Sequence, residues 1–199
     1  MIFKFFTLFV LLTTVNASTL YLYNCTDDYH FVVEQVEDEA RIFLQDRWVI
    51  AKRVLGVSSK QYKADKILYE VEGEEANLTI SGKYYRCGND SVAAAFKRAE
   101  LEGVVFRAVG YLPEWVLEIS SDKKVHFVTN HGENLTAFKV TEKYLGYETI
   151  EYKMHSQNNI MFVRVEARLC YDQKRQRSYE HSVYINFDGY ELRGCGKAL

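Results

Sequence analysis

The sequence predicts an all-β protein: two small antiparallel β-barrels or sandwiches joined by a short helix, with one disulfide in each half. Three observations support this prediction. Short segments rich in β-formers recur along most of the 199 residues, one segment between them has helical character, and four cysteines fall into two well-separated pairs. Strands that recur this often, with no helical period between them, are typical of small antiparallel barrels and sandwiches.

The first residues have the composition of a secretory signal peptide. One early lysine is followed by an apolar run from Phe5 to Leu12 and then by small polar residues. This order predicts a leader over residues 1–18, cleaved after Ala17 or Ser18. Because the apolar run is shorter than the roughly 20 residues that a membrane-spanning helix needs, we expect no membrane span and a periplasmic or secreted location.

Residues 19–88 are expected to form the first domain. Val, Ile, Tyr and Thr are frequent here, and polar reversals separate the runs. The segment ARIFLQDRWVIAKRV predicts a hairpin that reverses at Gln45-Asp46-Arg47, with Ile42 and Leu44 on one face. Two further reversals are expected at EGEE, residues 72–75, and at Ser81-Gly82.

The segment NDSVAAAFKRAELEG predicts the one helix. Asp90 or Ser91 can cap its N-terminus, its alanines have high helix propensity, and Gly103 can end it in a left-handed conformation. We therefore expect a helix over residues 91–102, inside a connector that covers residues 89–103.

Residues 104–199 are expected to form the second domain from three hairpins. Their reversals are predicted at residues 120–122, at residues 156–159 and at Asp188-Gly189. The last is the strongest signal, because a type I′ turn needs positive φ at both central residues and Asp-Gly meets this need at low cost.

The four cysteines are expected to form disulfides, since an even number in an exported chain favours bridges and four cysteines allow three pairings. The long gap between Cys87 and Cys170 favours Cys25 with Cys87 and Cys170 with Cys195. A metal site is not expected, because there is no CxxC and no histidine at ligand spacing from a cysteine.

Composition and motifs argue against several functions. The net charge is −2, from 25 basic and 27 acidic residues, so nucleic acid is not an expected partner. The sequence has no GxSxG, P-loop, GxGxxG or HExxH motif, so we expect no enzyme and no cofactor. A pair of carboxylates that hydrolyses a glycoside is the enzyme alternative.

Aromatic residues are frequent, with 15 tyrosines and two tryptophans. We expect them to pack across strands, with a ligand groove as the alternative. In the second domain, Tyr111, Pro113, Glu114 and Trp115 are the most distinctive surface candidates. The favoured interpretation is a structural turn in which Pro113 fixes the chain direction and Trp115 fills the core.

The N-terminal half resembles the membrane-bound or periplasmic inhibitors of C-type lysozyme from Gram-negative bacteria. The motifs YLYNC, SSKQY and EVEGEEANLTISG, together with Cys87, account for this resemblance over residues 19–88. It implies an eight-stranded antiparallel barrel tied by a disulfide. It also implies a loop of the form Ser-x-Ser-Gly-x-x-Tyr that enters the lysozyme cleft, assisted by a lysine just before a Gly-Asp/Glu-x-Ala segment.

Aligned on Tyr62, this chain keeps the central serine of that loop as Ser58. The leading serine corresponds to Gly56, the glycine corresponds to Ser59, and the lysine position corresponds to Glu72. The charge at this last position is therefore reversed.

The resemblance implies binding to a C-type lysozyme through the loop at residues 56–65, with Lys60 or Lys63 as possible cation donors. The expected partner-binding residues are Ser58, Ser59, Lys60, Tyr62, Lys63 and Glu72. The alternative is a non-inhibitory envelope binding module with the same fold, in which Glu72 and the altered loop serve another partner.

The C-terminal half resembles an uncharacterised β-rich domain of bacterial envelope proteins that is sometimes fused to the inhibitor domain. FRAVGYLPEWVLEI is similar to that family's opening motif, and LCYDQKRQRSYEHSVYINFDGYELRGCGKAL is similar to its ending with paired cysteines. The resemblance supports a bridge between Cys170 and Cys195, and it implies no known activity.

Overall fold

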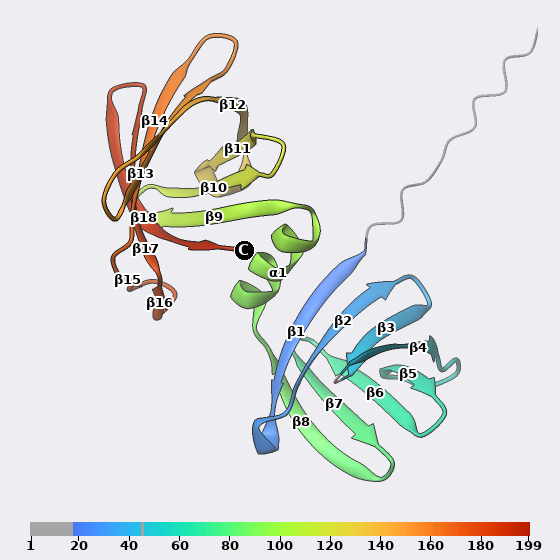
Figure 1. Cartoon of the computed structure of the whole chain (residues 1–199). Helices are drawn as coiled ribbons and strands as arrows, with labels where there is room; N and C mark the ends of the chain where they lie inside the picture. Colours follow the sequence, from blue (N-terminus) through green and yellow to red (C-terminus); the bar gives the residue numbers. More distant parts are fainter. Residues whose placement is uncertain (1–17, 45) are drawn as a thin grey trace, which may run out of the picture. The chain divides into compact units, whose positions relative to one another are not determined.

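The structure is a computed structural model that describes residues 18–44 and 46–199 (Figure 1). Residues 1–17 of the expected leader, and Gln45 of the expected reversal, lie outside the described residues. Within the described part of the chain, no helix is long and apolar enough to cross a membrane.

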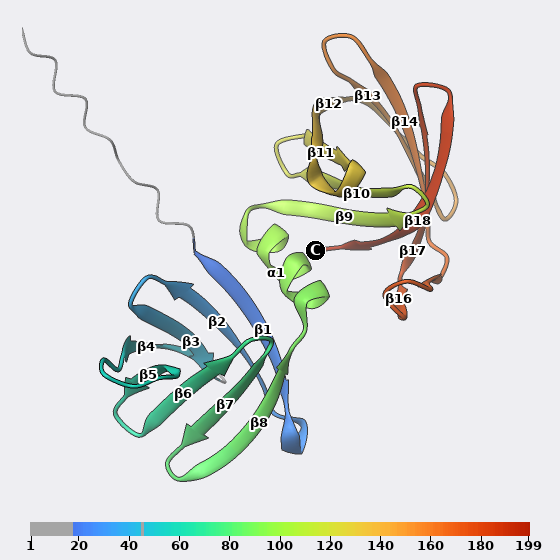
Figure 2. The ribbon, with the colours of Figure 1, turned by 180° about the vertical axis from the view of Figure 1, so that it is seen from behind.

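The predicted fold class is confirmed. The chain divides between Ser91 and Val92 into two units, and each unit contains a closed barrel of eight antiparallel strands (Figures 1 and 2). Both halves of the molecule are therefore barrels rather than sandwiches.

The first barrel is a simple meander in which each strand pairs with the next and β1 closes the ring against β8. Its strands are β1 Thr19–Cys25, β2 His30–Val36, β3 Glu39–Leu44, β4 Arg47–Arg53, β5 Lys60–Ala64, β6 Ile67–Glu72, β7 Glu75–Ile80 and β8 Lys83–Asn89, with the 3-10 turn η1 Thr26–Asp28 after β1. The predicted turns at Gly73 and at Ser81-Gly82 have the positive φ angles that such reversals need.

Alternation along the strands fills the first barrel with aromatic side chains. On β2, Phe31, Val33 and Gln35 point inward, because successive side chains of a strand lie on opposite faces. The ring of Tyr23, directly opposite Phe31 in the β1–β2 pair, has its centroid 5.1 Å from that of Phe31, and the ring of Tyr69 on β6 has its centroid 6.0 Å away. Tyr23, Tyr62, Tyr69 and Tyr85 all lie buried in this core.

The helix α1, Ser91–Leu101, lies close to the predicted limits, and Gly103 follows it with φ +84°. Phe96 is buried and packs with Val109, Tyr179 and Cys195. The helix is therefore part of the second unit's packing and covers one side of that unit's barrel.

The second barrel has the strand order β10-β11-β12-β13-β14-β17-β18-β9, so β9 closes the ring against both β10 and β18. Its strands are β9 Val104–Tyr111, β10 Glu114–Ser120, β11 Lys124–Thr129, β12 Asn134–Leu145, β13 Thr149–His155, β14 Ile160–Glu166, β17 His181–Phe187 and β18 Tyr190–Ala198, with the 3-10 turn η2 Asn130–Gly132 after β11. Between β17 and β18, Asp188 and Gly189 both have positive φ, as predicted.

Trp115 lies at the centre of the second core and is almost fully buried, as expected. Two glycines make room for its ring. A Cβ on Gly110 would lie 2.2 Å from Trp115 Nε1, and a Cβ on Gly194 would lie 2.2 Å from the Val109 carbonyl oxygen and 2.6 Å from the Trp115 ring. These close approaches explain why glycines occur in both motifs of the C-terminal half.

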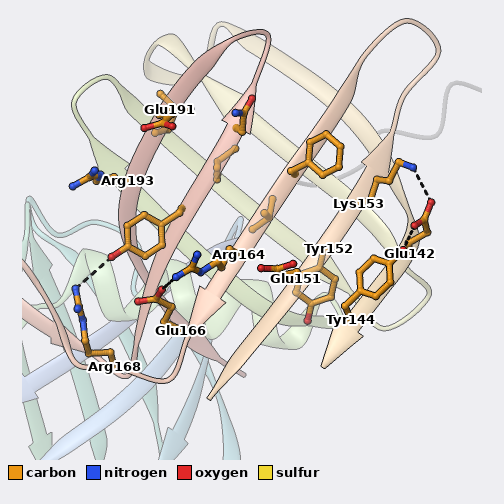
Figure 3. Close-up of a pocket in the computed structure, with 16 residues that line it drawn as sticks. Glu142, Tyr144, Glu151, Tyr152, Lys153, Arg164, Glu166, Arg168, Glu191 and Arg193 are labelled. Carbon is orange, nitrogen blue, oxygen red and sulfur yellow. Dashed lines mark hydrogen bonds and ion pairs between the residues drawn. The ribbon is translucent and has the colours of Figure 1, made fainter. Parts of the chain in front are cut away.

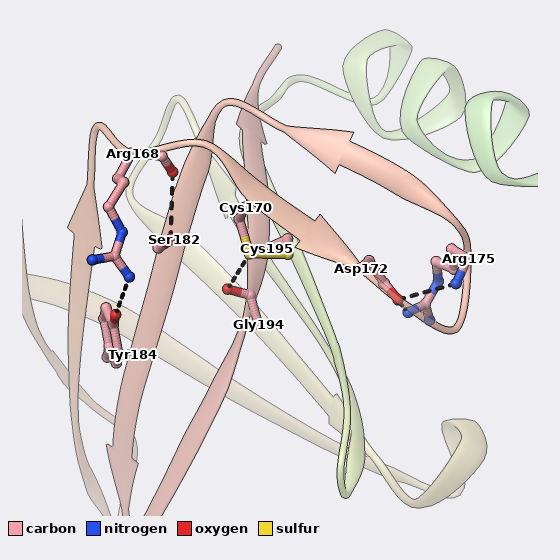
Figure 4. The surroundings of a disulfide bond; sticks show 8 residues. All are labelled: Arg168, Cys170, Asp172, Arg175, Ser182, Tyr184, Gly194 and Cys195. Atoms are coloured by element: carbon pink, nitrogen blue, oxygen red, sulfur yellow. Dashed lines mark hydrogen bonds and ion pairs between the residues drawn. A yellow bond between two sulfur atoms is a disulfide. The ribbon is translucent and has the colours of Figure 1, made fainter.

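Both expected disulfides are present. Cys25 and Cys87 are directly opposite on β1 and β8, where they hold the closure of the first barrel. Cys170, on β15 Cys170–Asp172, is bonded to Cys195 on β18 (Figure 4). This bridge fixes a small hairpin, β15 with β16 Arg177–Tyr179, to the second barrel.

Candidate functional site

The binding loop was predicted over residues 56–65, but Lys60–Ala64 forms strand β5, because these residues pair with β6. The loop between β4 and β5 therefore spans residues 54–59, at one end of the first barrel. Ser58 is exposed there, beside the exposed apolar side chains of Leu55 and Val57. Gly56 has φ +83° with open space around its Cβ position. A left-handed backbone favours glycine, so the loop's conformation accounts for glycine at the position where the inhibitor pattern has its leading serine.

Ser59 is turned toward the outer face of the sheet rather than toward the loop tip. Its Oγ donates a hydrogen bond of 2.9 Å to Glu70 Oε1, and Gln61 Nε2 donates to both Ser59 Oγ, at 3.0 Å, and Glu70 Oε1, at 2.8 Å. This triangle fixes the base of the loop, so Ser59 is in a supporting position.

Tyr62 was expected at the partner surface, but the structure places its side chain inside the barrel with 0 % exposure. The ring stacks on Tyr69, with centroids 5.8 Å apart. Its hydroxyl is buried with no hydrogen-bond partner among the described residues. Tyr62 therefore anchors β5 from within the core and does not present its ring to a partner, because alternation places the large aromatic residue of β5 inward.

Lys60 and Lys63 lie on opposite faces of β5. Lys60 points toward the open end of the barrel, where its Nζ donates a hydrogen bond of 2.7 Å to Gln35 Oε1 and lies 5.9 Å from the Tyr62 ring centroid. Lys63 lies on the outer face, opposite Lys52 in the β4–β5 ladder. Lys60 therefore lies at the barrel end that carries the loop, whereas Lys63 lies on the outer face of the sheet.

The hydrogen bond from Lys60 begins a polar chain through the first core. Gln35 Nε2 donates to the Tyr69 hydroxyl at 3.2 Å, and that hydroxyl donates to the Tyr23 hydroxyl at 3.0 Å. Burial raises the pKa of Tyr23 to about 12 and also raises the pKa of Tyr69 well above its ordinary value. Both phenols are therefore neutral near pH 7 and are poorly suited to acid–base catalysis there.

Glu72 is exposed at the end of β6, in the turn that leads to β7. Val71, its neighbour, is directly opposite Lys60, the first residue of β5. The structure thus brings Glu72 to the same end of the barrel as Ser58 and Lys60. Glu74 and Glu75 occupy the same turn, so a negative charge lies beside the predicted loop.

The distinctive turn of the second barrel has a structural role. Glu114 accepts ion pairs from Lys174 Nζ, at 2.9 Å, and from Arg175, at 3.4 Å. Arg175 also pairs with buried Asp172 at 2.7 Å (Figure 4). These contacts tie the β9–β10 turn to the β15–β16 hairpin, which agrees with the favoured interpretation.

A wide depression lies on the outer face of the second barrel, with a volume of about 830 Å³ (Figure 3). It is lined by residues of β12, β13, β14, β17 and β18 and by Arg168, and most of the lining side chains point outward. A ligand groove was the alternative prediction for the aromatic residues, but none of the residues that line this depression was predicted. A signal was present on β13, where polar and apolar residues alternate and so place Glu151 and Lys153 on the outer face.

In comparisons with known protein families, curated proteins and solved structures, no match to this chain is found. Among the described residues, no group of three or more histidine, cysteine or acidic side chains is placed to hold a metal ion.

Proposed function

We propose that the first barrel binds a C-type lysozyme and inhibits it by inserting the β4–β5 loop into the active-site cleft. The observation that carries the proposal is the exposed Ser58 on a loop that projects from a closed, disulfide-tied, eight-stranded barrel. This is the framework that the sequence resemblance implies. The proposal includes a periplasmic or secreted location, which two disulfides favour because such bonds persist in oxidising compartments.

The chemistry of the target suits a hydroxyl and a cation. A lysozyme cleft carries one carboxyl group that stays protonated as general acid and a second that is ionised. The Ser58 hydroxyl is suited to hydrogen-bond with the first. A lysine ammonium is suited to pair with the second once water is expelled, since a charge-assisted hydrogen bond is among the stronger polar contacts.

Lys60 is the better placed of the two candidate cations. It follows the loop directly, and its hydrogen-bond partner, Gln35, is a neutral amide, so its ammonium group has no ion pair among the described residues. Lys63 lies on the outer face, three residues further along β5. We expect Lys60→Ala to weaken inhibition more than Lys63→Ala, and equal inhibition constants for wild type and both variants would remove lysine from the proposal.

The loop is fixed before binding. The triangle of Ser59, Gln61 and Glu70 holds its C-terminal side, and Val54 N donates a hydrogen bond of 2.8 Å to Gln61 O on the other side. A loop that is already ordered loses less conformational entropy when it binds, so more of its contact energy appears as affinity.

The test is lysis of a peptidoglycan suspension by a C-type lysozyme, with and without the oxidised mature chain. We expect the wild type to slow lysis and Ser58→Ala to do so less effectively. Ser81→Ala is the matched control, because Ser81 is an exposed serine in the turn at the opposite end of the same barrel.

Two other results would replace the proposal. If the wild type fails to inhibit while Glu72→Lys inhibits, the barrel is a non-inhibitory binding module that serves another envelope partner. If the purified chain itself degrades peptidoglycan without added lysozyme, a carboxylate-based hydrolase takes its place.

A further inference from the structure

We infer that the outer face of the second barrel binds a neutral, extended oligosaccharide. This inference does not depend on the proposed function, which concerns the first barrel. It rests on the depression of about 830 Å³ that crosses strands β12, β13, β14, β17 and β18.

The strand register aligns the outward side chains of these strands in two rows. One row runs directly across the sheet through Tyr144, Glu151, Arg164, Tyr184 and Arg193. Figure 3 shows its labelled members rising from the same face of the sheet. Neighbouring strands lie about 4.8 Å apart, so a row over five strands is about 19 Å long. This length suits a chain of several linked units better than a single small molecule.

The second row is offset from the first by two residues on each strand, toward the same side of the sheet. It consists of Glu142, Lys153, Phe162, Asn186 and Glu191. A further hollow of about 270 Å³ shares Arg168, Tyr184 and Arg193 with the depression. The two rows and this hollow together form an elongated surface on the sheet face, here called the groove.

The charges of the groove exclude strongly charged ligands. Four basic side chains, Lys153, Arg164, Arg168 and Arg193, are balanced by four glutamates, Glu142, Glu151, Glu166 and Glu191. Four of these side chains form ion pairs with each other: Lys153 Nζ lies 2.8 Å from Glu142 Oε1, and Arg164 pairs with Glu166. A polyanion would meet the glutamates and a polycation the basic groups, and like charges in contact are unfavourable. A neutral ligand is the one that this surface does not repel.

Two exposed aromatic rings offer flat apolar surfaces within this polar setting. Phe162 is 52 % exposed and Tyr144 is 58 % exposed, and their strands are separated by one strand, about 10 Å across the sheet. Tyr184 is placed differently, because the guanidinium groups of Arg164 and Arg193 lie 5.8 Å and 5.7 Å from its ring centroid. Phe162 and Tyr144 are therefore the rings available to a ligand.

Hydrogen-bonding groups remain free beside these rings. Within the part of the chain that the structure describes, Glu151, Asn186 and Glu191 have no hydrogen bond or ion pair from their side chains. Carboxylates accept and an amide both donates and accepts, which suits hydroxyl groups. Sugar rings combine an apolar face for stacking with hydroxyl edges for such bonds, so an oligosaccharide satisfies both features of the groove.

An extended peptide fits this surface less well. Peptides commonly bind sheets by adding a strand to a free edge, and the second barrel is closed by β9 against both β10 and β18. The groove lies on the sheet face, where the backbone groups are already paired. Recognition must therefore come from side chains, which favours a ligand rich in hydroxyls.

The test is calorimetric titration of the full mature chain with two soluble probes, a β-1,4-linked hexamer of N-acetylglucosamine and a β-1,4-linked hexamer of glucose. We expect saturable binding of at least one of them. Amide chemical shifts should move along β12, β13, β14, β17 and β18. No lysozyme is present, so the result is independent of the inhibition assay.

Phe162→Ala should weaken that binding about tenfold, since loss of a stacked ring removes about 1.4 kcal/mol of contact energy. Phe162→Tyr keeps the ring and should bind like the wild type, which separates lost contact from lost folding. Tyr84→Ala on the first barrel, where Tyr84 is 59 % exposed, is the matched control and should leave binding unchanged. Binding of neither sugar, or unchanged binding by a folded Phe162→Ala variant, would overturn the inference.

Discussion

Lys60 Nζ donates a hydrogen bond of 2.7 Å to Gln35 Oε1 across the open end of the first barrel. This contact joins the surface loop to the buried phenols, because Gln35 in turn donates to Tyr69. It pairs the Lys60 ammonium group, two residues after Ser58, with a neutral amide. Lys60 of the proposed inhibitory surface is thus connected by hydrogen bonds to the core of the first barrel.

Reversal of the charge at Glu72 should strengthen inhibition. Glu72 lies at the same end of the barrel as the loop, and a carboxylate there would repel the ionised carboxylate of a lysozyme cleft. We expect Glu72→Lys to lower the inhibition constant by about tenfold or more, as measured from lysis rates. Glu180→Lys, the same change at an exposed site on the second barrel, should have no effect. An unchanged constant for Glu72→Lys would place this turn outside the contact surface.

The two stacked tyrosines of the first core should respond differently to loss of their hydroxyls. Tyr69→Phe removes a hydroxyl that bonds to both Tyr23 and Gln35, so we expect a loss of about 1 kcal/mol in the free energy of unfolding. Tyr62→Phe removes a buried hydroxyl that has no partner among the described residues, so stability should stay the same or rise. Urea unfolding measures both, and a clear loss for Tyr62→Phe would contradict the described packing.

The buried phenols predict a loss of stability in alkali. The pKa of Tyr23 is raised to about 12, whereas the unfolded chain loses the same proton near pH 10. Since the folded state binds this proton more tightly, its contribution to stability is complete below pH 10 and is lost as the pH rises toward 12. Urea midpoints at pH 8, 10 and 11 should fall in that order, and less steeply for Tyr23→Phe. Parallel falls for both proteins would assign the effect to other groups.

The close approach of Gly194 to Trp115 should make this glycine essential to the second barrel. A Cβ there would meet the Val109 carbonyl oxygen at 2.2 Å, so Gly194→Ala forces a backbone shift that we expect to cost about 2 kcal/mol or more. Gly88→Ala is the control, because a Cβ on Gly88 would have no atom within 4 Å. Equal unfolding midpoints for the two variants would show that the Trp115 site adapts readily.

Many of the turns, the helix and the two disulfide pairs could be predicted from the sequence. Asp188-Gly189 predicts its turn because positive φ is cheap there, and the cysteine spacing favoured the observed pairs. Barrel closure was beyond local reasoning, since it depends on long-range strand pairs such as Tyr23 with Asn89 and Cys195 with Val109.

For the proposed site, the sequence could not indicate which face of β5 each side chain occupies. Alternation implies that Lys60 and Lys63 lie on opposite faces, yet which face is inward depends on the burial of Tyr62. The groove of the second barrel was missed because its rows form only when five separate strands take their register.

The most direct test of the central claim is a double-mutant cycle between Ser58→Ala in this chain and a glutamine substitution of the general-acid carboxyl group in a C-type lysozyme. Dissociation constants for the four combinations give the coupling energy between the two side chains. The proposed loop insertion predicts a coupling of about 1 kcal/mol, as expected for one hydrogen bond. Additive effects, or no measurable binding of the wild type, would contradict it.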